Sequence, residues 1–376
     1  GDTIQFIRYI RLLSDQGISV RLAVQPQLHD LIVASGLHPS PVTPADCSQY
    51  NDGHWLPLLS LPRLLGVTPS NVIANEPYLR PLKRHLSKWR KLLSKESLPV
   101  VGIHWQGSQL VESSNDSFRG RSIPLEMFSV LLESNDIKFL SLQKGFGSEQ
   151  VQQCSFLDAF VGCQCEVDRT WDFLETLAII EACDLVITSD SAVAHLAGGL
   201  GKPTWLLLMH VPEWRWGLES DQTFWYPSLR LFRQERQGDW QGLLERVASA
   251  LSDYLLDFGA GLSSNRKSLP VCGDSLRVGL RRNKARLLQA IAPFWDWVER
   301  SAEEAPRSQL DSVDSEQVGL ISSADKEGCI ASTADITVIA NAIFSEDPDE
   351  HSDDVDRLVQ VFAYSRHPSV CHSLGR

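Results

Sequence analysis

Asp190, Ser191 and His195 lie close together in the stretch LVITSDSAVAHLAGGL, residues 185–200, and they are the residue types of a hydrolase triad. They also stand where an apolar run, typical of a buried strand, gives way to small residues typical of a helix. The start of a helix carries unpaired backbone N–H groups and a partial positive charge, which can hold a phosphate. A third interpretation is a capped core helix with a hydrogen-bonded histidine.

The spacing of these residues disfavours the triad. A nucleophile elbow needs G-x-S-x-G, and Ser191 has glycine at neither position. Asp190 is adjacent to Ser191, so it would orient His195 in the usual relay only through a distorted turn. From the local residues alone, the capped core helix and the phosphate site remain open as the two main interpretations.

The geometry of a phosphate site would follow from the helix itself. We expect the helix to begin at about Ser191, with Asp190 or the serine before it as the N-cap. Ala192 and Val193 leave room for a phosphate to approach the backbone, and Ser191 adds a hydroxyl donor. His195 follows Ser191 by one helical turn, on the same face, where it could contact a phosphate or a sugar.

Two further strand ends carry polar residues toward the same edge of the predicted sheet. The strand within residues 98–105 runs into a polar loop with Ser108 and Arg121, and the strand at 137–143 is followed by Lys144. Carboxyl ends of neighbouring parallel strands meet at one edge, where ligands bind. Arginine gives bidentate hydrogen bonds to phosphate. Each side chain alone would be an ordinary surface residue, but three on one edge favour an anion site.

Asp2 stands in the first turn of the predicted N-terminal helix. As an isolated feature, an aspartate at this position is a good helix cap. On the rim of a cleft, the same carboxylate could act as a general base, which is typically worth about 10²–10⁴-fold in rate.

The order of the predicted elements is that of an α/β protein. A helix over residues 1–17 is followed by a strand at 18–24 and a short helix from Pro26, and a second alternating series begins at residue 98. Because the alternation restarts once, the sequence predicts two doubly wound domains with a cleft between them.

Composition divides the chain into three segments. Residues 1–80 hold the first α/β series, whose first strand we expect to precede Gly1, and residues 81–257 hold the second. Residues 258–376 read as a linker, a basic helix and an acidic, serine-rich tail, which we expect to be poorly ordered.

The overall charge and the cysteines limit the class of protein. The net charge of −12 argues against a nucleic-acid partner, which would require a basic face. The sequence has no apolar run near the ~20 residues that a membrane span needs, and no visible signal peptide. The eight cysteines form no zinc-binding pattern, so we expect reduced thiols and a cytoplasmic location.

Two long motifs resemble a known family. The runs DLVITSDSAVAHLAGGLGKPTWLLL and EWRWGLESDQTFWYPSLRLFRQERQGDW look like the glycosyltransferase-like module found C-terminal to tetratricopeptide repeats in bacterial proteins. That module is similar to the ADP-heptose:lipopolysaccharide heptosyltransferases, glycosyltransferase family 9. The resemblance covers residues 1 to about 257 and is strongest over 171–240. It implies a GT-B fold, in which two Rossmann-like domains face each other and the C-terminal one binds the donor nucleotide.

The resemblance also implies roles for individual residues. The family's Asp-Thr-Gly-x-x-His donor motif falls here on Asp190, Ser191, Ala192 and His195, with Val193 inside it. The family's Gly-Asp near the N-terminus, which supplies the proposed base, matches Gly1-Asp2. The remaining matches are to donor-site positions, at Ser108, Arg121, Lys144 and Glu149.

The activity implied is a metal-independent, inverting transfer of a hexosyl or heptosyl group. The donor would be a nucleotide diphosphate sugar, and the acceptor a hydroxyl of a glycan, a lipid-linked sugar or a protein. The resemblance implies no cofactor and no nucleic acid, and it is compatible with a place at the periphery of the inner membrane. The alternative is a catalytically inactive module of the same fold that binds a sugar, a nucleotide or a protein.

Overall fold

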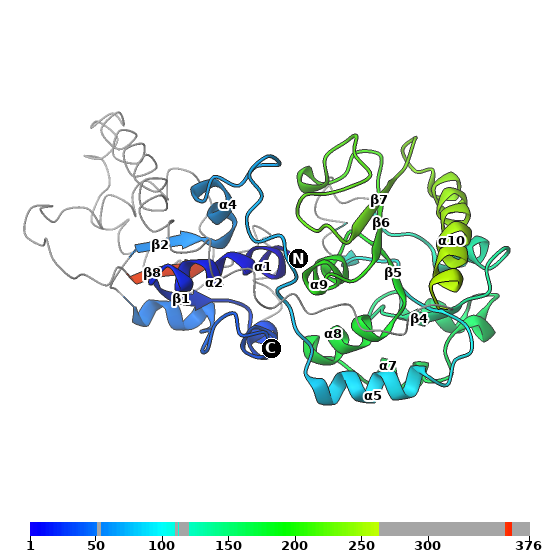
Figure 1. Ribbon diagram of the computed structural model, residues 1–376, viewed down its shortest axis with the longest axis horizontal. Coiled ribbons are helices and arrows are strands. Elements are labelled where there is room, and N and C mark those ends of the chain that lie inside the picture. The colour runs from blue at the N-terminus through cyan, green and yellow to red at the C-terminus, as the bar shows by residue number, and fades with distance from the viewer. Residues whose placement is uncertain (51–53, 110–111, 113–119, 263–357, 363–376) are drawn as a thin grey trace, which may run out of the picture.

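The computed structural model describes the chain over residues 1–50, 54–109, 112, 120–262 and 358–362. Over this part the protein is mixed α/β, with a parallel sheet of three strands and a parallel sheet of five. Figure 1 shows the two sheets on opposite sides of the helices α1 (Asp2–Phe6) and α9 (Ala192–Leu200), which contact each other.

The N-terminal segment forms two short helices where one was expected. α1 is followed directly by α2 (Arg8–Asp15), and Gly17, with φ of 76°, ends the helical segment as predicted. The predicted apolar face is buried, at Ile4, Ile7 and Ile10. Polar residues on the other faces are buried as well, at Thr3, Gln5 and Arg8. Residues 3–10 are therefore enclosed on all sides, unlike a surface helix with one apolar stripe, whereas Arg11, Ser14 and Asp15 at the end of α2 are exposed.

The three-stranded sheet has the order β1–β8–β2. β1 (Ser19–Ala23) confirms the predicted strand at 18–24, whereas β2 (His54–Pro57) was not predicted. The central strand is β8 (Leu358–Phe362), which pairs with β1 on one side and β2 on the other. Five residues of the predicted tail therefore form a strand of this sheet; residues 263–357 and 363–376 lie outside the described residues.

Short helices connect the strands of this half. Pro26 opens a 3₁₀ turn as predicted, and Thr43 closes a capping box with Asp46, whose Oδ2 accepts from Thr43 Oγ1 at 2.6 Å. The connecting helices are η1 (Pro26–Leu28), α3 (His29–Ala34), η2 (Pro44–Gln49), η3 (Leu58–Ser60) and α4 (Leu61–Leu64).

The five-stranded sheet has the order β4–β3–β5–β6–β7. Its strands are β3 (Val100–His104), β4 (Lys138–Ser141), β5 (Leu185–Ser189), β6 (Thr204–Leu208) and β7 (Leu229–Arg233). The first four confirm predicted strands, and β7 was not predicted. Every residue of β3, β5 and β6 is buried, as expected of parallel strands covered on both faces.

Alternate side chains along the strands pack into two separate apolar cores. In β5, Val186 packs into a core with Leu196 of α9, whereas Ile187 packs into a second core with Leu243 and Val247 of α10. The first core also contains side chains of α1, α2 and α3, so it continues into the N-terminal half.

The helices on the two faces are of unequal length. α5 (Lys83–Leu93), α8 (Phe173–Ala182) and α9 contribute to the first core, and α10 (Trp240–Leu262) and η5 (Leu125–Leu131) to the second. η5 is a 3₁₀ helix where a helix to about Glu133 was expected, and α10 runs past the expected boundary at 257. Four further short helices are α7 (Gln164–Asp168), η6 (Ser148–Gln152), η7 (Leu157–Ala159) and η8 (Trp214–Trp216).

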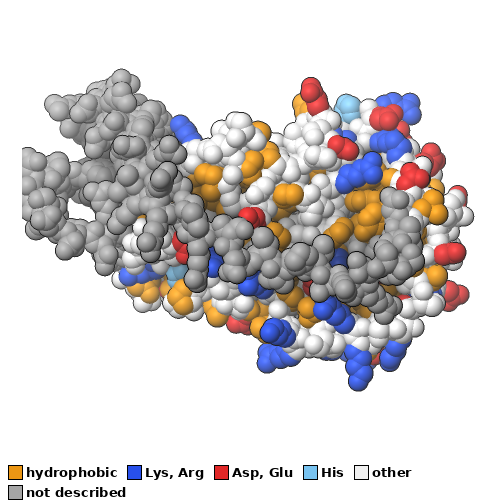
Figure 2. All heavy atoms as spheres, viewed as in Figure 1, with side chains coloured by type: hydrophobic (Ala, Val, Ile, Leu, Met, Phe, Trp, Pro, Cys, Tyr) orange, Lys and Arg blue, Asp and Glu red, His pale blue; other side chains and the backbone are white. Residues whose placement is uncertain are grey.

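Exposed cations gather on α5. Figure 2 shows Lys and Arg side chains along the lower edge of the molecule, where α5 lies in Figure 1. Two of them pair with α8, because Lys88 Nζ lies 3.0 Å from Glu175 and Arg90 Nη2 lies 3.7 Å from Glu181. Surface pairs of this kind contribute little each, so the buried Trp89 and Leu93 account for most of the packing of α5.

The close contact of α9 with Tyr226 gives a stability prediction. A Cβ at Gly198 would overlap the ring of buried Tyr226. Overpacking costs about 1–3 kcal/mol, whereas Ala gains at most ~1 kcal/mol over Gly in a helix. We expect Gly198→Ala to lower the free energy of unfolding, measured by denaturant titration. In the control Gly162→Ala, the new Cβ meets only Glu96 Oε1, at 3.7 Å, and an equal loss in both variants would contradict the prediction.

Candidate functional site

The candidate site lies at the carboxyl edge of the five-stranded sheet, between β3 and β5. The chain runs outward from β3 to β4 on one side and returns to β5 on the other side of β3. Connections that leave in opposite directions at such a switch point create a crevice, where ligands of open α/β sheets bind. Because His104 pairs in register with Thr188, the segments that follow both strands meet at this crevice.

Ser191 is the N-cap of α9. Its backbone is extended (φ −153°, ψ 178°), and its Oγ accepts a hydrogen bond from the N–H of Val193 at 3.3 Å. The helix therefore begins at Ala192, and the expectation of Asp190 or Ser189 as the cap is wrong. The N–H groups of the first turn of α9 lie at the carboxyl edge of the sheet, where they contribute partial positive charge.

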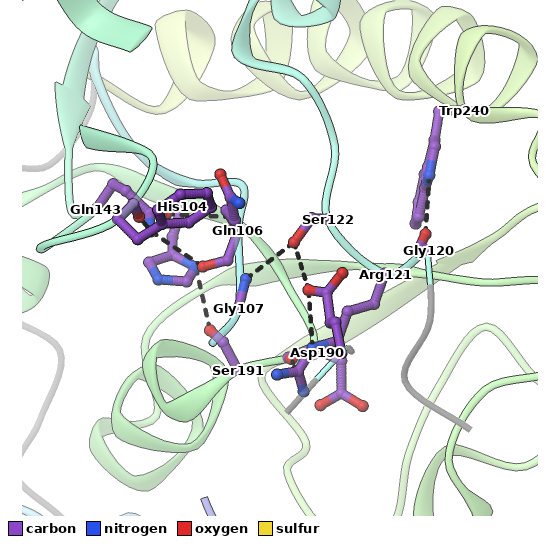
Figure 3. Close-up of polar contacts among 12 residues, drawn as sticks. His104, Gln106, Gly107, Gly120, Arg121, Ser122, Gln143, Asp190, Ser191 and Trp240 are labelled. Atoms are coloured by element: carbon purple, nitrogen blue, oxygen red, sulfur yellow. Dashed lines mark hydrogen bonds and ion pairs between the residues drawn. The ribbon is translucent and has the colours of Figure 1, made fainter. Parts of the chain in front are cut away.

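His104, the last residue of β3, contacts this cap (Figure 3). Its Nδ1 lies 3.2 Å from Ser191 Oγ, which also lies 3.3 Å from Thr188 Oγ1. Burial lowers the pKa of His104 to about 3, and the nearby Arg121 charge acts in the same direction. The imidazole is therefore neutral at pH 7 and holds the cap without adding charge.

Arg121 lies beside the cap, from the loop after β3 (Figure 3). Its Nη1 donates to the backbone oxygen of Asp190 at 3.3 Å, and its Nε lies 3.4 Å from Glu112 Oε1. The guanidinium covers Gly107, where a Cβ would overlap it. Only glycine at 107 permits this close approach, so the loop and the arginine position each other.

His195 does not join Ser191 and Asp190. It is buried, its Nδ1 lies 2.9 Å from Tyr226 Oη, and its ring stacks on Trp216 at 5.6 Å between centroids. Burial, together with the Arg215 charge, lowers its pKa well below the usual range. The hydroxyl of Ser191 is engaged by His104, so the triad disfavoured from the sequence is not assembled.

Asp2 reaches the start of α9 from the N-terminal half. Its Oδ1 accepts a hydrogen bond from Arg215 Nη2 at 2.6 Å, and it caps no helix through its side chain, contrary to the simple helix-cap interpretation. α1 contacts α9 so closely that a Cβ at Gly1 would lie 3.1 Å from His195 Cδ2. This contact brings the Asp2 carboxylate, which is 34% exposed, to the first turns of α9.

The buried carboxyl of Asp190 lies within reach of two cations, Arg215 on the side of α1 and Arg121 beside the start of α9. Burial raises the pKa of its carboxyl, and the Arg215 and Arg121 charges offset part of that effect. The two arginine charges therefore compensate part of the cost of burying this carboxyl.

Among the described residues, three that were predicted for the donor site make no hydrogen bond with the Ser191 cap. Lys144 Nζ donates to the backbone oxygen of Val167, and exposed Glu149 accepts from the N–H of Gly147 at 2.9 Å. Ser108 lies in the loop after β3 with its side chain exposed. Arg121, rather than Lys144, is the cation placed beside the cap.

Several site residues were missed by sequence reasoning. His104 stands at the end of a buried strand, and a polar residue in that position could have marked it. Arg215 and Glu213 stand in the run EWRW, which belongs to the second motif of the family resemblance but carries no local sign of a site. Their involvement depends on contacts with Asp2 and Gln5, more than two hundred residues earlier.

Within the described part of the chain, no helix is long and apolar enough to cross a membrane. The same residues include no group of three or more His, Cys, Asp or Glu side chains arranged to hold a metal ion.

Comparison with known proteins gives partial likenesses. No family model matches the sequence. The Protein FlbA of Caulobacter vibrioides is 29% identical over 182 residues, covering 47% of this chain and 29% of FlbA, so the chain spans well under half of that relative. Among solved structures, a glycosyl transferase family 9 protein from Veillonella parvula DSM 2008 is similar with a TM-score of 0.33 and 17% identity, over 53% of this chain and 58% of that one.

The neutral state of His104 gives a pH prediction. Its folded pKa of about 3 lies below the reference value of 6.5, so between these values the unfolded chain binds a proton that the folded chain does not. Stability is therefore intact above pH 6.5 and falls as the pH drops toward 3. From pH 7 to pH 5 we expect a loss of about 2 kcal/mol from this residue, and His104→Gln should lack it in urea unfolding.

His210→Gln is the matched control for this measurement. His210 follows β6 at the same edge of the sheet but is exposed to solvent, so folding does not strip it of water. If the His104 and His210 variants depend on pH in the same way as the parent protein, the burial argument is wrong.

Proposed function

We propose that the chain is a glycosyltransferase of the GT-B type, which moves a sugar from a nucleotide diphosphate sugar to a hydroxyl acceptor. One observation carries the proposal: Arg121 lies beside the start of α9, and α1, which brings the Asp2 carboxylate from a distant part of the chain, packs against the same helix. The first pair suits a leaving diphosphate, and the carboxylate suits an acceptor hydroxyl.

The donor diphosphate would lie over the first turn of α9. The backbone N–H groups and partial positive charge of a helix start favour phosphate, and Arg121 would add charge-assisted hydrogen bonds. Ala192 supports this placement, since its methyl group is the smallest side chain other than glycine. His104 would act indirectly, by holding the Ser191 cap in place.

The transfer step assigns one role to each wall of the crevice. The acceptor oxygen forms a bond to the anomeric carbon while the bond from that carbon to the β-phosphate oxygen breaks, and the nucleoside diphosphate leaves with the electron pair. Asp2 takes the proton of the hydroxyl. Arg121 and α9 stabilise the charge that develops on the leaving group. The positive charge in this scheme comes from the protein, and attack opposite the leaving group inverts the anomeric centre.

The proposal divides the chain at the crevice. Residues 1–80, completed by β8, would form the acceptor half, and residues 81–262 the donor half. The sheet order supports the second of these, because it has a switch point between β3 and β5, and α9, which follows β5, packs against α1. A glycan, a lipid-linked sugar and a protein hydroxyl all remain within the proposed acceptor class.

Asp2→Asn tests the role of the base. We expect kcat for nucleoside diphosphate release to fall about 10²–10⁴-fold, with donor affinity unchanged, because the amide keeps the shape of the side chain but accepts no proton. The measurement is a coupled release assay with a panel of nucleotide diphosphate sugars, and calorimetry gives the affinity. Full activity in this variant would exclude Asp2 as the base.

Arg121→Gln tests the donor site. We expect nucleoside diphosphate affinity to fall about tenfold or more, since a charge-assisted hydrogen bond contributes about 1.5–3 kcal/mol. The control is Arg90→Gln, which removes an exposed arginine of α5. Equal affinity in both variants would contradict the placement of the donor. Donor binding without turnover by the parent protein would replace the transferase by a binding module.

A further inference from the structure

Arg215 connects the two walls of the crevice. It lies in η8, in the loop after β6, and its side chain is only 8% exposed. Its guanidinium lies 5.6 Å from the centroid of Trp214 and 5.9 Å from that of Phe6, and its backbone oxygen accepts from Trp225 Nε1 at 3.1 Å. The aromatic surroundings restrict the directions in which its N–H groups can point.

Glu213 orients the guanidinium from its own loop. Its Oε2 accepts from Arg215 Nε at 2.6 Å and from the backbone N–H of Arg215 at 3.1 Å, and its Oε1 lies 3.3 Å from Nη2. Two contacts between planar groups fix the plane of the guanidinium better than a single ion pair would. The edge formed by Nη1 and Nη2 is thereby directed toward α1.

That edge holds α1 at two points. Nη2 donates to Asp2 Oδ1 at 2.6 Å, and Nη1 donates to Gln5 Oε1. Asp2 and Gln5 are three residues apart, so they share one face of the helix. Arg215 therefore fixes both the rotation of α1 and the side chain of Asp2, and the second oxygen of that carboxylate remains for another partner.

The local charge makes the arginine necessary. Asp2 and Glu213 both bind Arg215, and its charge also acts on Asp190. Without the cation, the carboxylates that share it would repel one another. The Asp2 side chain would then turn toward solvent.

We propose that Arg215 is a positioning residue that fixes the Asp2 carboxylate against the acceptor hydroxyl. This inference rests on the proposed function and adds a residue to it. Arg215 belongs to the opposite half of the chain from Asp2, so the base is in place only while the loop after β6 is docked on α1. Arg215 itself touches neither the donor nor the reacting atoms.

Arg233 supplies a matched control. It extends from β7 and binds backbone oxygens of the same loop: its Nε donates to Gly217 at 3.2 Å, and its terminal nitrogens donate to Trp216 and Ser220. Arg233→Gln removes hydrogen bonds within this loop but keeps the Arg215 guanidinium and its ion pair with Asp2, so we expect its effect on kcat to be the same in the parent and in the Asp2→Asn protein. A purely structural role of Arg215 would give the same pattern in both variants.

The experiment is a double-variant cycle in the full chain. Arg215→Gln, Arg215→Lys and Arg233→Gln are made in the parent and in the Asp2→Asn protein, and kcat, donor affinity and melting temperature are measured for each. We expect Arg215→Gln to lower kcat at least tenfold in the parent and less than about twofold in the Asp2→Asn background. Donor affinity should stay unchanged, and Arg215→Lys should recover part of the rate, since lysine keeps the charge but not the planar fork.

Each outcome decides between stated alternatives. If the double variant Asp2→Asn/Arg215→Gln loses less melting temperature than the sum of the two single variants, the pair is supported. If the losses add, the pair is overturned. An equal effect of Arg215→Gln in both backgrounds overturns the positioning role, as does a loss of donor affinity, which would make Arg215 a donor ligand. No turnover by the parent protein with any nucleotide diphosphate sugar overturns the proposed function and this role together, whereas turnover with additive effects overturns this role alone.

Discussion

Arg8 imposes the constraint on which the arrangement of the crevice depends. Its charge is buried, and among the described residues it has no carboxylate partner. Instead, its Nε donates to the backbone oxygen of Gln5 at 2.7 Å and its Nη1 to that of Trp225 at 2.6 Å, while the guanidinium lies over the rings of Tyr78 and Tyr226. A buried cation is costly unless its N–H groups are satisfied. Among the described residues Arg8 Nη2 has no hydrogen-bond partner, so the buried charge depends on its contacts with Gln5, Trp225 and the two tyrosine rings, which join α1 to the segments around Tyr78 and Tyr226.

The rings around Arg8 extend this constraint to both helices of the crevice. Tyr78 Oη donates to the backbone oxygen of Ile4 in α1 at 2.7 Å, and Tyr226 Oη lies 2.9 Å from His195 Nδ1 in α9. One buried charge therefore holds α1 against the first turns of α9. The backbone of Asp2, at the start of α1, is placed by this packing, whereas its carboxylate is held by Arg215 from the loop after β6. The same packing explains why His195, one turn into α9, is enclosed by aromatic rings.

The sequence predicts those features that depend on local patterns. Buried apolar runs identify β3, β4, β5 and β6, and the small-residue run after β5 identifies α9 within one residue of its true start. Arg121 is correctly placed at the sheet edge because it follows a strand end. Lys144 stands at the same edge, but its Nζ donates to the backbone oxygen of Val167; the direction taken by a long side chain has no signal in the local sequence. Contacts across the chain have no such local signal: the Asp2–Arg215 pair joins residues 213 positions apart, and β8 completes its sheet from the far end of the sequence.

The distribution of charge gives the crevice a direction. On the side of α1, the single cation Arg215 is bound by two carboxylates, Asp2 and Glu213, so this wall is acidic. On the side of α9, the helix start carries partial positive charge next to Arg121, and the two histidines there are neutral because they are buried. Arg121 is itself paired with Glu112, so the backbone N–H groups at the start of α9 are the feature that favours an anion on that side, whereas an uncharged hydroxyl can lie against α1 without penalty. In the proposed reaction, the anionic donor would therefore be directed to the start of α9 and the uncharged acceptor to α1.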